Sequence, residues 1–158
     1  MNTYERLENE ACKDGIDIIN KKFSSPRIKG LYIDGTIAIN ENIKNSKERA
    51  CVLAEELGHH HTSVGNILNQ TIASNRKQER QARLWAYDKQ IGLNGLIRAY
   101  EHGCKSRYEI AEYLEVTEQF LEEAILEYRE KYGICTTVGK YLVYFIPQLI
   151  ICKKYNIE

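Results

Sequence analysis

Two glutamates and a histidine lie within one short segment, Glu55-Glu56-Leu57-Gly58-His59, and their types and spacing could support hydrolysis. Successive residues of an α-helix turn by about 100°, so Glu55 and His59 project about 40° apart with Glu56 beside them. Residues at i and i+4 can reach one metal ion, and a neighbouring glutamate can hold a water molecule next to it. The segment therefore predicts a metal-dependent site on a helix. The apolar residues of that helix fall on its other side: Ala50, Leu53, Ala54 and Leu57.

Two further histidines, His60 and His61, follow directly. On the same helical wheel they lie about 140° and 240° from Glu55, so both are poorer ligand candidates than His59. We expect His61 to lie at the helix end or in the core.

A third ligand is needed, because catalytic zinc takes three protein ligands and a water molecule. Glu79 shares a helical stripe with Ala82 and Ala86, whose small side chains would let this helix approach the first one closely. Alternatively, Glu79 pairs with Arg83 at i,i+4 on a solvated face. Spacing alone does not decide between these interpretations.

These two segments resemble a known family. Glu56-Leu57-Gly58-His59 resembles the last four residues of the HELGH form of the HExxH zincin motif. Glu79-x-x-Ala82-x-x-Trp85-Ala86 is similar to the ExxAxxFA pattern of the ImmA/IrrE metallo-endopeptidases. The resemblance is strongest over residues 4–100 and includes a preceding Gly-Leu-Tyr hairpin.

The resemblance implies a role for each matching residue. Glu56 would be the general base, and His59 and Glu79 would be metal ligands. Glu55 stands where the family has its first histidine ligand. A carboxylate can bind zinc at a similar distance, although oxygen ligands also favour harder ions such as Mn²⁺. We therefore expect a Zn²⁺ site, with Mn²⁺ possible, formed by Glu55, His59 and Glu79.

The implied function is that of a zinc-dependent endopeptidase, a hydrolase with the variant motif EELGH. Many members of the family are encoded by phages and mobile elements and act on helix-turn-helix repressors, so we expect such a repressor as substrate and an anti-repressor role. The alternative is a non-catalytic, zincin-shaped module that binds a repressor or another protein without cleaving it. An extended substrate could pair with the edge of a strand, and the predicted docking strand is Thr36, Ile37, Ala38 and Ile39.

Periodicity and capping signals predict an α+β fold in which helices dominate. Residues 1–100 are expected to form a mostly helical, zincin-like metallopeptidase core with a small β-hairpin or sheet. Residues 101–158 would form helix-turn-helix-like helices and a β-rich tail packed on that core. In the first half, the expected elements are a helical region over 3–23 that Gly15 ends or kinks, a hairpin over 31–39 turning at Asp34-Gly35, a helix over 46–62 capped by Asn45, and a polar loop over 63–74. In the second half they are helices over 76–91, 107–115 and 118–132, the last two capped by Ser106 and Thr117, and a β-rich segment over 141–151.

The amino-acid composition limits the classes of partner that the protein is expected to bind. The 158 residues carry 22 basic and 22 acidic side chains, so no overall charge attracts the chain to nucleic acid or a membrane. The 118–132 helix contains five glutamates, which would repel phosphates, so direct DNA binding is a weaker alternative. The five cysteines form no CxxC pair, and the N-terminus has no signal-peptide pattern, so we expect reduced thiols and a cytoplasmic location.

Overall fold

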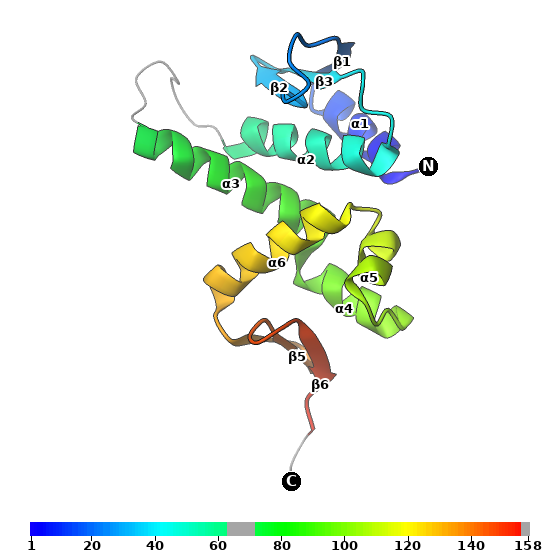
Figure 1. Ribbon diagram of the computed structural model, residues 1–158, viewed down its shortest axis with the longest axis vertical. Coiled ribbons are helices and arrows are strands. Elements are labelled where there is room, and N and C mark those ends of the chain that lie inside the picture. Colours follow the sequence, from blue (N-terminus) through cyan, green and yellow to red (C-terminus); the bar gives the residue numbers. More distant parts are fainter. Residues whose placement is uncertain (63–71, 156–158) are drawn as a thin grey trace. The chain divides into compact units, whose positions relative to one another are not determined.

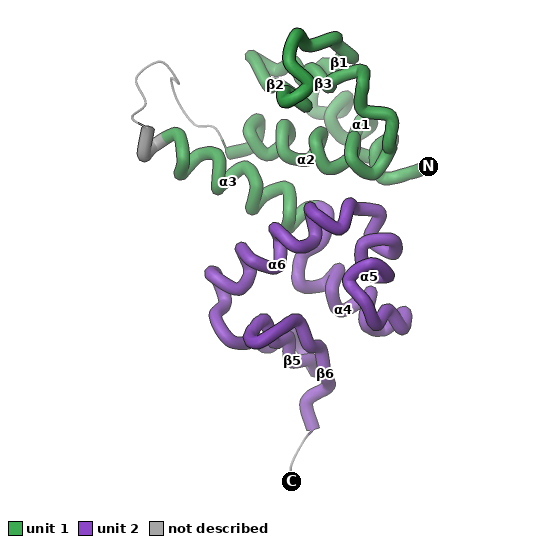
Figure 2. The backbone as a smooth tube through the Cα atoms, viewed as in Figure 1, with its two compact units in different colours: residues 1–89 green, residues 90–158 purple. Residues whose placement is uncertain are grey.

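The computed structural model describes residues 1–62 and 72–155, apart from the side chains of residues 72–74. The chain forms two compact units, residues 1–89 and 90–158 (Figure 2). It is mostly helical with two small three-stranded sheets, as the α+β prediction expected (Figure 1). The elements are α1 (Thr3–Lys13), β1 (Asp17–Lys21), β2 (Gly30–Ile33), β3 (Thr36–Asn40), α2 (Ser46–Thr62), α3 (Ile72–Gln90), α4 (Gly92–His102), α5 (Arg107–Leu114), α6 (Glu118–Tyr132), β4 (Cys135–Val138), β5 (Tyr141–Tyr144) and β6 (Ile150–Lys153).

The N-terminal helix ends just before Gly15, as one of the two interpretations of this glycine predicted, and the helical pattern does not continue to Phe23. Asn2 caps α1 through a complete capping box with Glu5, and the helix ends at Lys13. Gly15 follows with φ of +75°, a conformation that ends helices. The β-branched residues after it then form β1, whose parallel pairing with a distant strand was not visible in the local pattern.

The first sheet has the order β1-β3-β2. The predicted hairpin is confirmed: Ile33 pairs with Thr36, and Asp34 and Gly35 have φ of 44° and 79°, as a type I′ turn requires. Since β3 pairs with β1 on one side and β2 on the other, the prediction of a docking edge at Thr36–Ile39 is wrong. The two edges of this sheet belong to β1 and β2.

Helix α2 packs on one face of this sheet. The side chain of Asn45 accepts hydrogen bonds from the backbone N–H groups of Lys47 and Glu48, at 2.8 and 3.2 Å, which confirms the predicted N-cap. The core beneath the sheet is apolar, with Ile37, Ile39 and Leu53 fully buried. The start of the predicted 63–74 loop lies outside the described residues, and α3 begins earlier than predicted, at Ile72.

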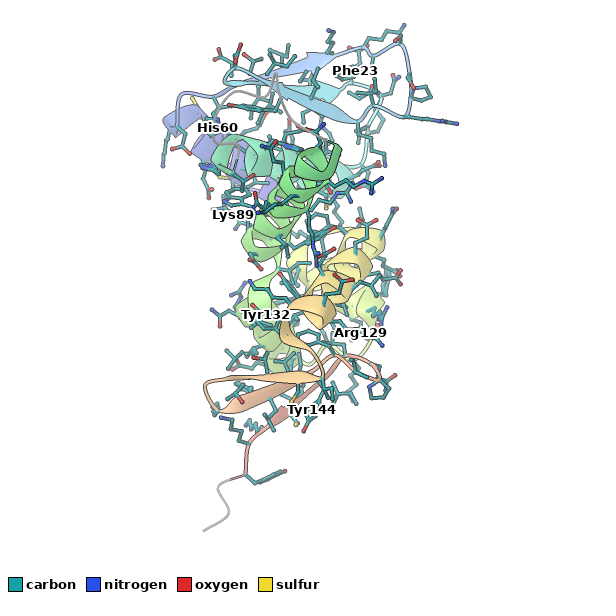
Figure 3. All side chains as sticks on the ribbon, turned by 90° about the vertical axis from the view of Figure 1, so that its left-hand side faces the viewer. Phe23, His60, Lys89, Arg129, Tyr132 and Tyr144 are labelled. Carbon is teal, nitrogen blue, oxygen red and sulfur yellow. The ribbon has the colours of Figure 1, made fainter. Side chains whose placement is uncertain are left out.

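The second unit joins α4, α5 and α6 to the sheet β4-β5-β6. Ser106 and Thr117 cap α5 and α6 as predicted, each accepting a backbone N–H at 3.1 Å. The sequence signals did not predict α4, and the expected domain boundary at residue 100 falls inside this helix. Figure 3 labels Arg129 and Tyr132 on α6 and Tyr144 on β5.

Two negative findings apply to the described part of the chain. No helix there is long and apolar enough to cross a membrane. All five cysteines are free thiols.

Candidate active site

The crossing of α2 and α3 brings the two predicted motifs together. Gly58 faces the backbone of Ala82, and a Cβ atom at position 58 would lie 2.3 Å from the Ala82 carbonyl oxygen. Ala82 and Ala86 are completely buried, which is consistent with their predicted role as small residues at a helix contact. The close crossing therefore depends on a residue without a side chain at position 58.

At this crossing, Glu79 reaches His59. The Nε2 atom of His59 lies 3.3 Å from Oε1 of Glu79, and both side chains remain partly exposed, at 23% and 53%. The structure thus places Glu79 against the site helix. The two residues come from motifs separated by 20 positions in the sequence.

Glu56 lies between this pair and the sheet. Its side chain contacts β2, because a Cβ atom on Gly30 would lie 3.1 Å from Cγ of Glu56 and 3.2 Å from its Oε1. Burial, together with the smaller effects of the neighbouring carboxylates of Glu55 and Glu79, raises the pKa of Glu56 from 4.5 to about 7. A carboxyl group with a pKa near neutrality is well suited to accept and release a proton.

The nitrogen of His59 and the oxygen of Glu79 have the separation expected of two ligands of one divalent cation. Ligands about 2.1 Å from a tetrahedral ion lie about 3.4 Å from each other, and the His59–Glu79 separation is 3.3 Å. Within residues 1–62 and 75–155, however, no three histidine, cysteine or acidic side chains gather as a complete metal site. The pair His59 and Glu79 is in place, and Glu55 lies close enough to Glu56 to raise the pKa of its carboxyl group.

Tyr32 belongs to the Gly-Leu-Tyr hairpin of the resemblance, but the sequence analysis gave it no role in the site. Its hydroxyl group lies 2.7 Å from Nδ1 of His60, and the two rings meet edge to face. Figure 3 labels His60 on α2. Alternation along β2 could have indicated Tyr32, because it lies two residues from Gly30 and so on the same face of the sheet.

His61 has a different role at the end of α2. Its ring stacks on Trp85 with centroids 4.7 Å apart, and its Nε2 lies 3.8 Å from Oδ2 of Asp14. Burial, together with the charge of His60, lowers the pKa of His61. At the end of α2, His61 therefore contacts Asp14, which caps α1, and Trp85 on α3, and neither contact involves a metal ion.

Within the described residues, β2 pairs only with β3, and its other edge lies beside Glu56. In a two-residue hairpin, the pair next to the turn is hydrogen-bonded and the pairs then alternate. Ile33 and Leu31 therefore direct their backbone groups toward β3, whereas Tyr32 and Gly30 direct theirs to the open edge. Since Gly30 also contacts Glu56, an extended chain paired there would pass next to the carboxylate.

Comparison with known proteins gives one match. Residues 11–126 match the family model Peptidase_M78, described as the IrrE N-terminal-like domain. Neither the curated proteins nor the solved structures gave a match. The matched region contains both site helices and most of the chain. The protein therefore belongs to the Peptidase_M78 family, the ImmA/IrrE metallopeptidases, as the resemblance of its two motifs implied.

Proposed function

We propose that this protein is a metal-dependent endopeptidase that acts through the α2–α3 crossing. The observation that carries the proposal is the convergence of His59 and Glu79, 3.3 Å apart, beside the half-buried carboxylate of Glu56. His59 and Glu79 would hold the ion, with Glu55 as the third ligand. The donor set of one nitrogen and carboxylate oxygens suits Zn²⁺ and also Mn²⁺.

The proposed chemistry divides between the ion and the chain. A bound divalent ion would polarise the scissile carbonyl and make a water molecule more acidic. Glu56 would accept the proton of that water and then pass it to the nitrogen of the leaving amine. The packing of Glu56 against Gly30 holds the carboxyl group on the side of the site that faces β2.

The substrate would bind as an added strand on β2. The outward-facing backbone groups of Gly30 and Tyr32 can pair with an extended peptide. This proposal replaces the docking strand predicted at Thr36–Ile39, which is paired on both sides. It retains β-strand addition as the mode of recognition.

The substrate would be another protein, and we propose a helix-turn-helix repressor whose cleavage relieves repression in a phage or mobile element. The resemblance to the ImmA/IrrE family supports this proposal, since many members encoded by phages and mobile elements act on such repressors. A cytoplasmic site of action agrees with it, because repressors act there and the five thiols are free.

Metal content tests the site. Purified protein reconstituted with Zn²⁺ or Mn²⁺ is expected to hold about one ion per chain, and Glu55→Gln, His59→Ala and Glu79→Gln should each lose it, as measured by elemental analysis. His102→Ala, a histidine substitution on α4, is the matched control and should keep the ion.

Each other outcome has a distinct meaning. Retention of the ion in Glu55→Gln alone would show that Glu55 is not the third ligand. Absence of metal from the wild-type protein after reconstitution would overturn the proposal. That result would favour the alternative function, a zincin-shaped module that binds its partner without cleaving it.

Docking on β2 has its own test. In a peptide that the protein cleaves, methylating the backbone nitrogens that face Gly30 and Tyr32 should raise KM by about tenfold, because each methylation removes a hydrogen-bond donor. Methylating the alternate nitrogens, which point away from β2, is the control and should change KM little. Equal effects from both sets would contradict docking on this edge.

A further inference from the structure

The second unit contains a cavity of about 130 Å³ between α6 and the segment that joins β5 to β6. Four of its lining residues lie on α6: Glu122, Ile125, Leu126 and Arg129. Their spacing of i, i+3, i+4 and i+7 places them on one face of the helix. An apolar cavity of about 150 Å³ can hold a benzene molecule, so this one has room for a group of nearly that size. We call it the α6 cavity.

The middle of the α6 cavity is apolar. Ile125 and Phe145 form the buried part of its wall, with 4% and 1% of their surface exposed. Leu126 is 59% exposed, although its side chain is a large aliphatic one. Pro147, on the segment between β5 and β6, also lines the cavity and is exposed. An apolar group bound here would remove part of this surface from water, which favours binding.

The two ends of this face of α6 carry opposite charges. Glu122 and Arg129 are seven residues apart, about 10 Å along the helix axis, which is too far for an ion pair. Glu122 instead pairs with Arg107 on α5, with 3.7 Å between Oε1 and Nη1. Within the described residues, Arg129, which Figure 3 labels, has no acidic partner. The α6 cavity therefore carries one positive charge that the described residues do not balance.

A carboxylate is the anion that fits this arrangement. The guanidinium group of arginine is a planar fork of N–H donors that binds a carboxylate through two parallel hydrogen bonds. The single charge of a carboxylate matches the single unbalanced charge of Arg129. A phosphate group carries up to two negative charges, and the second would be repelled by Glu122. The side-chain amide of Gln148 lines the cavity and offers further N–H donors.

We propose that the α6 cavity binds the carboxylate of a compound whose apolar group is about the size of a benzene ring. The carboxylate pairs with Arg129, and the apolar group covers Leu126. A free aromatic acid and the C-terminal residue of a peptide share this chemistry. Every residue that lines the cavity belongs to the second unit, so this binding does not depend on the proposed peptidase function.

Heteronuclear NMR titration of the full chain tests this binding. The two probes are phenylacetate, a free acid, and N-acetylglycylphenylalanine, which presents a peptide C-terminus. At least one should bind with a Kd on the order of 1 mM, with the largest shifts at Leu126 and Arg129, and the tighter of the two identifies the source. The corresponding amides have no negative charge and should bind at least about tenfold more weakly.

Substitutions at the two ends of the cavity should change phenylacetate binding in opposite directions. Arg129→Gln should raise Kd at least about tenfold, and Arg129→Lys, which keeps the charge without the planar fork, should raise it less. Glu122→Gln leaves Arg107 without its partner and should lower Kd about threefold. Lys131→Gln removes another cation of α6, one that does not line the cavity, and should leave Kd unchanged. Circular dichroism checks that each variant is folded.

Several outcomes would overturn the proposal. One is that neither acid binds at concentrations up to about 20 mM. Another is that acids and amides bind equally, or that Arg129→Gln and Lys131→Gln have the same Kd. Inorganic phosphate that binds as tightly as the acids would show that the apolar wall of the cavity plays no part, and this would also contradict the proposal.

Discussion

Replacing Glu56 by glutamine is expected to reduce peptide hydrolysis by about 10²- to 10⁴-fold, because an amide cannot accept the proton of the attacking water. The His59–Glu79 pair is unchanged in this variant, so metal content should match that of the wild-type protein. Hydrolysis is measured as kcat/KM on a cleaved peptide, with metal analysis on the same sample. Glu41→Gln, an exposed carboxylate on the loop after β3, serves as the control.

The same substitution should stabilise the metal-free protein above neutral pH. The folded-state pKa of Glu56, about 7, lies above the ordinary value of 4.5, so the folded protein binds this proton more tightly than the unfolded chain does. The free energy of unfolding therefore falls as pH rises from about 4.5 to 7 and levels off above that range. Glu56→Gln removes this loss, which amounts to about 3 kcal/mol.

Denaturant unfolding in the presence of a chelator measures this difference. The wild-type protein and Glu56→Gln should be of similar stability at pH 4.5 and differ most at pH 8. A constant difference across the range would show that Glu56 does not titrate near pH 7. Normal hydrolysis by Glu56→Gln would instead contradict its role as the base.

The second large effect is expected at Gly58. In Gly58→Ala the new methyl group would lie 2.3 Å from the carbonyl oxygen of Ala82, and this backbone atom cannot move without displacing α3. Overpacking of this kind costs about 1–3 kcal/mol, which outweighs the gain of about 1 kcal/mol in helix propensity. The variant should be less stable and should also lose metal, because displacement of α3 separates Glu79 from His59.

Gly95→Ala provides the matched control. Gly95 is also a buried helical glycine, but a Cβ there would meet Leu114 at 3.5 Å, an ordinary contact. This variant should be as stable as the wild-type protein or slightly more stable, with its metal retained. Thermal unfolding and metal analysis compare the two variants. Equal behaviour of Gly58→Ala and Gly95→Ala would contradict the close α2–α3 crossing.

Local sequence signals determined most of the individual elements. The Asp34-Gly35 turn and the caps at Asn45, Ser106 and Thr117 depend on residues within a few positions, and the structure contains all of them. The position of Glu56 next to His59 on one helix also follows from spacing alone. The family could be inferred from two short motifs because their residue types carry the chemistry.

Tertiary structure decided which strands lie at the edges and which side chains meet. The residues of β1 resemble a helix continuation until their pairing with β3 is known, and that pairing makes β3 central and leaves β2 as the open edge beside the site. Residue spacing did not decide whether Glu79 is a metal ligand or pairs with Arg83. The close packing of Gly58 against Ala82 places the Glu79 carboxylate 3.3 Å from His59. Contacts between segments far apart in sequence depend on packing, which no local pattern encodes. The sequence by itself determined the chemical groups and their helices, and the packing of α2 against α3 and β2 determined their arrangement around Glu56.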